Sequence, residues 1–362
     1  MTFFMPSFAT QQLLPPWYSK AARNWAFIIP IDPQCIQNYL DVWLNSKGPD
    51  QAPYYWKAMP AAEHGYGVLM VCDHTDFSSI QDGEPGWERL KHREVLWIFP
   101  AYRYERTADN LLVGQPTITW IQPFALDDNS FVMFSSREIW GCEKDMATIQ
   151  LEQGKAADPF DINIALQGCK VFNPRSISHL IGVMKISMKH PEKPFDLQDW
   201  ERDVSDPNLA GMLGHFLAGI AGPTRNPKTR QPLKPNKIEI NTLKQFRDAF
   251  DLRYAAYRGI VASSVTHDQV STAKFHSGED ITIDFMWSDT FAERWTQLFG
   301  LTPPTFPPGY RDLEGQKLPP ANVIDWDMPS VRGKVTLAVS FTADTTFEVL
   351  DTLFTYGLPS GS

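Results

Sequence analysis

The chain has 362 residues, of which 43% are hydrophobic and 21% charged, and its formal net charge is −9 at pH 7. This composition is typical of a well-folded globular protein with a large core and argues against an intrinsically disordered chain. The acidic balance, with no Lys/Arg-rich run to offset it, argues against a nucleic-acid partner.

No apolar run approaches the roughly 18 residues of a membrane span, so we expect no membrane partner. The first 16 residues lack the basic start and apolar stretch of a signal peptide. The four cysteines lie far apart, with no Cys-x-x-Cys pair to suggest a zinc site or a dense disulfide framework. We therefore expect a cytoplasmic protein without a metal or cofactor.

The N-terminal third predicts an arm, a strand, a helix and a second strand. Residues 1–22 read as an arm, and the apolar run 25–31 reads as a strand. Ile36, Tyr39, Leu40 and Trp43 recur at helical spacing after the Asp32-Pro33 start signal. Glycine and proline predict a loop over 45–63, residues 66–72 read as a strand, and 73–92 read as a polar loop.

The middle of the chain is dominated by strand patterns that are apolar on both faces, which is typical of a barrel wall or a layer between two others. The predicted strands are 94–104, 113–122, 130–139, 161–172 and 180–189. Between the second and third, Asp127-Asp128-Asn129 predicts a hairpin turn.

The C-terminal part mixes helices and strands. Apolar segment 208–221 and the stripe in 242–257 predict helices, as does 290–299, and strands are predicted over 259–265, 280–286 and 334–341. Three Pro-Pro pairs between residues 303 and 320 predict an extended wrap. We expect an arm over 1–22, one β-rich α+β domain over 23–299, and a proline-rich wrap with a C-terminal strand or helix over 300–362, packed on the same domain.

No phosphate-binding loop, dinucleotide fingerprint, His-Glu-x-x-His helix or Gly-x-Ser-x-Gly elbow is present in the sequence. Asp73-His74-Thr75-Asp76 could supply metal ligands, but a solvated loop is the better interpretation, because no partner histidine lies at metal-ligand spacing. The segment 137–147 places Lys144 between Glu143 and Asp145, just past Gly141. From its residues alone, this segment is a charged turn.

The sequence Ser136-Arg137-Glu138-Ile139-Trp140-Gly141-Cys142-Glu143-Lys144-Asp145-Met146-Ala147 resembles a motif of the acetoacetate decarboxylase superfamily. That motif reads Gly-Arg-Glu-(apolar)-x-(small)-(aromatic)-Pro-Lys-Lys-(apolar)-(small), and the spacing from Arg-Glu to the first lysine is preserved. The resemblance implies that Lys144 is a Schiff-base nucleophile and that the fold is an antiparallel, cone-like β-barrel with a few peripheral helices.

The resemblance extends to other site residues. Glu94, six positions before Pro100, matches a catalytic glutamate that opens a strand, and Arg23 matches an arginine near the family site. The family proline and second lysine are replaced by Glu143 and Asp145, and no acid occupies the place of a second family glutamate in 66–72. Family members commonly assemble into homo-oligomers, so we expect one here.

A Schiff base requires a neutral amine, and a lysine with a pKa near ~10.4 is almost entirely charged at pH 7. Lowering the pKa by about three units costs ~4 kcal/mol, which an apolar pocket can supply. Asp145 would raise the pKa if it faced the amine. We therefore expect the rings of Trp97, Phe99 and Trp140 to desolvate Lys144 and to line the substrate pocket.

The leading hypothesis is a lyase that decarboxylates a small β-keto acid, with Lys144 as nucleophile, Glu94 as proton shuttle and Arg23 as the group that holds the substrate carboxylate. One alternative is an aldolase or dehydratase that uses the same iminium, favoured if Glu143 and Asp145 reach the pocket. A second alternative is a small-molecule-binding protein that keeps the barrel without the chemistry. An ion pair is the structural alternative for Arg23.

Overall fold

The computed structural model describes residues 13–45, 52–59, 65–107, 109, 111–153, 159–189, 216, 237–247, 255–308, 310 and 319–355. The helix predicted over 208–221 lies outside these ranges except for Phe216. Within the described ranges, no helix is long and apolar enough to cross a membrane.

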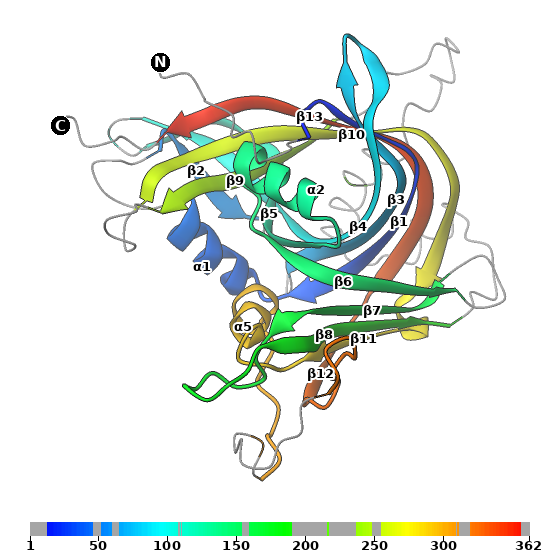
Figure 1. Ribbon diagram of the computed structural model, residues 1–362. Coiled ribbons are helices and arrows are strands. Elements are labelled where there is room, and N and C mark those ends of the chain that lie inside the picture. The colour runs from blue at the N-terminus through cyan, green and yellow to red at the C-terminus, as the bar shows by residue number, and fades with distance from the viewer. Residues whose placement is uncertain are drawn as a thin grey trace.

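Strands make up most of this part of the chain, as Figure 1 shows. In chain order they are β1 (Trp17–Ile31), β2 (Tyr54–Ala58), β3 (Gly65–Gln81), β4 (Glu84–Arg106), β5 (Leu112–Asp127), β6 (Lys144–Gln153), β7 (Pro159–Gly168), β8 (His179–Met188), β9 (Lys237–Arg247), β10 (Ala255–Ser277), β11 (Ile281–Met286), β12 (Ser330–Gly333) and β13 (Leu337–Thr355). The helices are α1 (Pro33–Trp43), α2 (Ser130–Ser135), the π-helix η1 (Ser136–Trp140), the 3-10 turn η2 (Gly278–Asp280) and α5 (Ala292–Phe299).

The strands form one curled sheet in the order β12-β11-β8-β7-β6-β5-β9-β10-β13-β1-β3-β4-β2. A further pairing between β5 and β4 closes β4, β5, β9, β10, β13, β1 and β3 into a ring. Neighbours in the sheet are antiparallel except that β5 runs parallel to β6 and to β9. The predicted fold class, a β-rich barrel with a few peripheral helices, is confirmed.

The wall of the ring is apolar on both faces because both faces are buried. On β4, Leu96 and Ile98 belong to the core inside the ring, whereas Val95, Trp97 and Phe99 belong to the core outside it. This is the period-two alternation of a strand. The outer core lies between the ring, the helices α1 and α5, and the strands that continue the sheet from β6 to β12.

The ends of the chain enter the ring directly. β1 begins at Trp17, inside the stretch predicted as an arm, and β13 lies between β1 and β10. In the proline-rich stretch, Phe306 and Tyr310 pack against the outer core, and the Tyr310 hydroxyl donates a hydrogen bond to the carbonyl of Trp287 at 3.0 Å.

Three predicted elements are wrong. Residues 130–139 form α2 and η1 instead of a strand, because the Asn129 side chain caps the helix by accepting from the amide of Phe131 at 3.0 Å. The helix predicted over 242–257 is replaced by β9 and the start of β10, whose pairing overrides the local apolar stripe. The loop predicted over 73–92 is a hairpin of β3 and β4, with a two-residue turn at Asp82-Gly83, both at positive φ. The predicted loop 45–63 also contains β2.

Candidate active site

The ring encloses a cavity of about 60 Å³. One water needs roughly 10–15 Å³ on the same measure, so the space accommodates a small organic molecule. Each ring strand contributes to its lining, together with α2, η1 and the start of β6. The described lining residues are Trp17, Asn24, Met70, Cys72, His74, Phe77, His92, Glu94, Leu96, Ile98, Gln122, Val132, Ser136, Trp140, Cys142, Lys144, Phe216, Ile238, Ile240, Val265, His267, Thr345 and Phe347.

A tight turn directs Lys144 into this cavity. Gly141 ends η1 in the left-handed conformation (φ 71°), and a Cβ there would overlap the backbone of Lys244. Only glycine satisfies both conditions. The extended residues that follow alternate, so Lys144 faces the cavity while Glu143 and Asp145 point away from it.

Glu143 and Asp145 both bind Arg294 outside the cavity, at 2.8 Å and 2.9 Å from its Nη2 atom. Neither residue lines the cavity. The condition under which the sequence favoured an aldolase or dehydratase, that these two side chains reach the pocket, is therefore not met.

Lys144 lies between two buried carboxylates. Its Nζ atom donates to Oε2 of Glu94 at 2.5 Å and to Oδ2 of Asp127 at 3.1 Å. The side chains of Lys144, Glu94 and Asp127 are 5%, 7% and 0% exposed. Glu94 and Asp127 are direct partners in the register of β4 and β5. Like charges in this position repel, and the lysine between them offsets that repulsion.

Sequence reasoning missed Asp127, which it placed in a hairpin turn. Asp127 instead ends β5, where its Oδ1 atom accepts from the amide of Asn129 at 2.9 Å. The second acid of the site therefore comes from β5 and not from the strand over 66–72, where the family resemblance implied one.

The two carboxylates decide the charge of Lys144. Burial alone lowers the pKa of Lys144, but Glu94 and Asp127 together raise that pKa above its ordinary value. Burial likewise works to raise the pKa of Glu94 and of Asp127, and the Lys144 ammonium holds both below their usual range. The unliganded site therefore holds an ammonium ion, and the expectation that surrounding rings keep Lys144 neutral is wrong.

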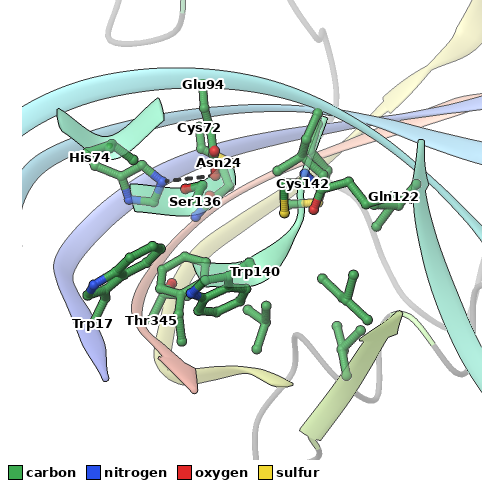
Figure 2. Close-up of a pocket in the computed structure, with 18 of the residues that line it drawn as sticks. Trp17, Asn24, Cys72, His74, Glu94, Gln122, Ser136, Trp140, Cys142 and Thr345 are labelled. Atoms are coloured by element: carbon green, nitrogen blue, oxygen red, sulfur yellow. Dashed lines mark ion pairs between the residues drawn. The ribbon is translucent and has the colours of Figure 1, made fainter. Parts of the chain in front are cut away.

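Two stacked histidines extend this charged group. The rings of His74 and His92 lie 4.5 Å apart at 14°. His74 Nε2 lies 3.8 Å from Oε1 of Glu94, and His92 Nδ1 lies 3.4 Å from Oδ2 of Asp127. Figure 2 shows the His74 ring turned toward Glu94. Burial and the neighbouring His92 lower the pKa of His74, so its ring is neutral near pH 7. The solvated loop predicted for these residues is wrong, because His74 is buried in β3.

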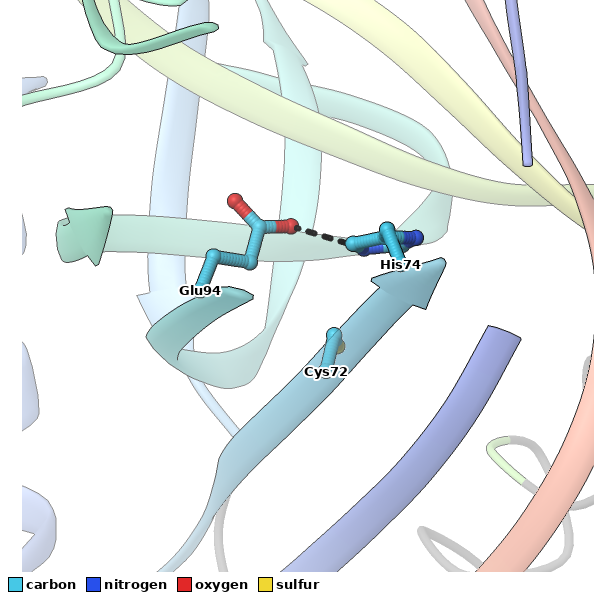
Figure 3. Close-up of side chains that lie close together, drawn as sticks. All are labelled: Cys72, His74 and Glu94. Carbon is cyan, nitrogen blue, oxygen red and sulfur yellow. Dashed lines mark ion pairs between the residues drawn. The ribbon is translucent and has the colours of Figure 1, made fainter. Parts of the chain in front are cut away.

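One group of described residues has the composition of a metal site. Ligand atoms of Cys72, His74 and Glu94 lie within 4.8 Å of one another, and Figure 3 shows Cys72 and His74 on the same strand with Glu94 opposite. Burial raises the pKa of the Cys72 thiol well above its ordinary value. A metal ion here would have to displace that thiol proton and share Glu94 with Lys144.

Rings form the apolar part of the cavity wall. Trp17 and Trp140 stack with centroids 5.0 Å apart at 13°, and both face the cavity (Figure 2). Trp140 therefore lies where the sequence predicted it. Its carbonyl accepts a hydrogen bond from the Thr242 hydroxyl, which ties η1 to β9.

Three predicted pocket residues lie elsewhere. Trp97 and Phe99 are on the opposite face of β4 from Glu94, where Trp97 packs against Phe299 with ring centroids 4.1 Å apart. Arg23 is on the outer face of β1 and forms an ion pair with Asp73. Arg23 does not line the cavity, so the ion-pair alternative describes its position.

The sequence matches no known family profile and no curated protein. Solved structures are similar to the whole chain. Acetoacetate decarboxylase from Legionella pneumophila has a TM-score of 0.49 and 10% identity, covering 97% of this chain and 93% of its own. The enduracididine biosynthesis enzyme MppR, complexed with pyruvate, has a TM-score of 0.45 and 14% identity, with coverages of 97% and 95%.

An acetoacetate decarboxylase-like enzyme from Sphingomonas wittichii has a TM-score of 0.47 and 10% identity, covering 97% of this chain and 98% of its own. In structure, the chain is similar over nearly its whole length to acetoacetate decarboxylase and acetoacetate decarboxylase-like enzymes, the superfamily that the motif around Lys144 resembles.

Proposed function

We propose that the protein is a Schiff-base-forming lyase in which Lys144 condenses with the carbonyl group of a small molecule. The observation that carries this proposal is the position of Lys144. Its amine is buried at the wall of an apolar cavity, within hydrogen-bond distance of two carboxylates that can move protons.

The charge of the site suits an iminium ion. The condensation of an ammonium with a carbonyl compound gives an iminium and water, so the charge at Nζ is +1 before and after the reaction. Carboxylates that stabilise the Lys144 ammonium therefore also stabilise the iminium. The raised pKa of Lys144 is compatible with this chemistry because the cation that the site favours is retained.

Glu94 supplies the proton transfers that the condensation needs. Lys144 first passes a proton along the 2.5 Å hydrogen bond to Glu94, which makes the amine and a carboxylic acid. Burial favours this neutral pair, because it penalises both charges of the ion pair. The amine adds to the carbonyl carbon, and Glu94 then returns the proton to the hydroxyl that leaves as water. An iminium and an ionised Glu94 result.

Decarboxylation of a β-keto acid and aldol-type cleavage or dehydration all proceed from this iminium. The rival proposal is a protein that binds carbonyl compounds without chemistry, in which the ion pair between Lys144 and Glu94 is permanent. The homo-oligomer that the family resemblance implies stays a prediction.

Reductive trapping tests the proposal. The protein is incubated with cyanoborohydride and either acetone or a keto acid, and its peptides are analysed by mass spectrometry. We expect an alkyl adduct on Lys144 with at least one of these compounds, and none in Lys144→Arg, which keeps the positive charge. Lack of an adduct on Lys144 with every compound would favour the binding protein.

A further inference from the structure

We infer that the cavity accepts an uncharged carbonyl compound rather than a keto acid, and that the lyase reaction is the cleavage of a carbon–carbon bond in an uncharged β-hydroxy ketone. This inference rests on the proposed Schiff-base function. It is carried by the charges around the cavity and by the position of the arginines near it.

Lys144 is the one lysine or arginine among the described residues that line the cavity. Its charge is already shared by Glu94 and Asp127. The lysine and the two carboxylates together carry a net charge of −1. The carboxylate of a keto acid would be a third anion beside a single cation, in a space from which water is largely excluded.

The histidines do not change this balance. Burial lowers the pKa of His74, and burial with its neighbour His74 lowers the pKa of His267 to about 4, so both rings are neutral near pH 7. His92 faces Asp127, and a proton on His92 would do no more than neutralise that carboxylate. None of these rings offers an uncommitted positive charge to a substrate.

The nearby arginines are committed outside the cavity. Arg23 and Arg93 both bind Asp73, which lies on the outer face of β3. Arg294 binds the two acids that flank Lys144, and Arg137 donates to the Lys144 carbonyl at 3.2 Å. The group expected to hold a substrate carboxylate, Arg23, is thus directed away from the site.

The rest of the described lining favours an apolar molecule. Five aromatic rings face the cavity, and they belong to Trp17, Phe77, Trp140, Phe216 and Phe347. Such walls gain free energy from contact with apolar groups and cannot hydrogen-bond a carboxylate. An aliphatic or aromatic ketone fits both the charge and the surface.

Cleavage of a β-hydroxy ketone uses the groups at hand. Once the iminium has formed, the Glu94 carboxylate removes the proton of the β-hydroxyl group. The bond between the α- and β-carbons breaks, its electron pair moves to the iminium to give a neutral enamine, and an aldehyde leaves. Protonated Glu94 then protonates the enamine carbon, and water releases the ketone and the Lys144 ammonium. Atoms and charge balance without a further reagent.

A matched pair of ketones tests the inference. Levulinate and methyl levulinate share the same ketone and differ in whether the carboxyl group is charged. One further charge about 5 Å away, at an effective dielectric constant of about 20, corresponds to a preference on the order of 100-fold. We expect methyl levulinate to trap Lys144 with cyanoborohydride on the order of 100-fold more efficiently than levulinate. We also expect release of benzaldehyde from the aldol adduct of acetone and benzaldehyde.

The outcomes separate the inference from the function on which it rests. Equal trapping by the two ketones, or preferential trapping by levulinate, would overturn the uncharged substrate while leaving the Schiff base intact. Trapping by neither ketone nor by acetone would overturn both proposals. Asp127→Asn removes one of the two negative charges, so in this variant the preference for methyl levulinate should fall about tenfold or more. An unchanged preference in that variant would contradict the role given to site charge.

Discussion

Replacement of Asp127 by asparagine changes the charge beside Lys144 with little change in shape. The carboxylate lies 3.1 Å from Nζ. Two unit charges at 3.1 Å attract by about 5 kcal/mol at an effective dielectric constant of about 20, equal to about 4 pKa units. Local relaxation reduces this upper bound, so we expect the pKa of Lys144 to fall by about 2 units or more in Asp127→Asn.

The amine fraction of Lys144 can be measured by its carbamylation with cyanate, because the step is irreversible and only the neutral amine reacts. Peptide mass spectrometry gives the rate at Lys144 relative to the exposed Lys57 in the same sample. A fall of two pKa units raises that ratio about 100-fold at a pH well below the pKa of Lys144.

Asp128→Asn is the matched control. Asp128 accepts from the amide of Arg93 at 2.6 Å and makes no contact with Lys144. We expect its effect on the carbamylation ratio to stay within about twofold. An unchanged ratio in Asp127→Asn, or an equal rise in both variants, would refute the conclusion that the Asp127 carboxylate holds Lys144 in its charged form.

Three further predictions concern stability and the cavity wall. Gly141→Ala should lower the free energy of unfolding by about 1–3 kcal/mol more than Gly114→Ala, measured with urea, because both glycines have positive φ but only Gly141 lacks room for a Cβ; equal losses would contradict the close approach to β9. The pKa of His267 falls from 6.5 to about 4 on folding, so its contribution to stability is complete above about pH 6.5 and is lost, by about 3 kcal/mol, as the pH falls through about 4. His267→Gln should therefore lose that much less stability than the wild type between pH 7 and pH 4, and an identical loss would rule the effect out. Trp97→Phe should cost about 1–3 kcal/mol of stability and leave acetone trapping within about twofold, whereas Trp140→Phe should weaken trapping; the reverse order would place the pocket on the wrong face of β4.

Local patterns in the sequence predicted much of the barrel. The strands around Trp25, Glu94 and Val183 are continuous apolar runs, because each is buried on both faces. α1 follows an Asp-Pro start signal, and the Asp32 side chain accepts from the amide of Gln34 as such a cap should. Elements specified by their own residues were therefore predictable.

Elements specified by distant residues were not. β9 has an apolar stripe at helical spacing, and its pairing with β10 decides its conformation. Buried polar residues misled the prediction in another way, because His74 and His92 have the polarity of loop residues although they face the interior of the ring. A strand that lines a polar site reads as a loop when only hydrophobicity is considered.

The site was predicted in part. Lys144 and Glu94 were found from the family resemblance, but their meeting with Asp127 depends on the register of β4 and β5, which no local pattern specifies. The error at Trp97 and Phe99 was avoidable. They lie three and five positions after Glu94, and strand alternation alone places odd spacings on the opposite face.

The central claim is that Lys144 forms an iminium with an uncharged ketone and that Glu94 moves the α-proton. Exchange of acetone hydrogens in deuterium oxide, followed by proton NMR, measures this directly, because each enamine that is reprotonated incorporates deuterium. The account predicts catalytic exchange by the wild type, none above background in Lys144→Arg, and a rate at least about tenfold lower in Glu94→Gln. Wild-type exchange no faster than that of Lys144→Arg would contradict it.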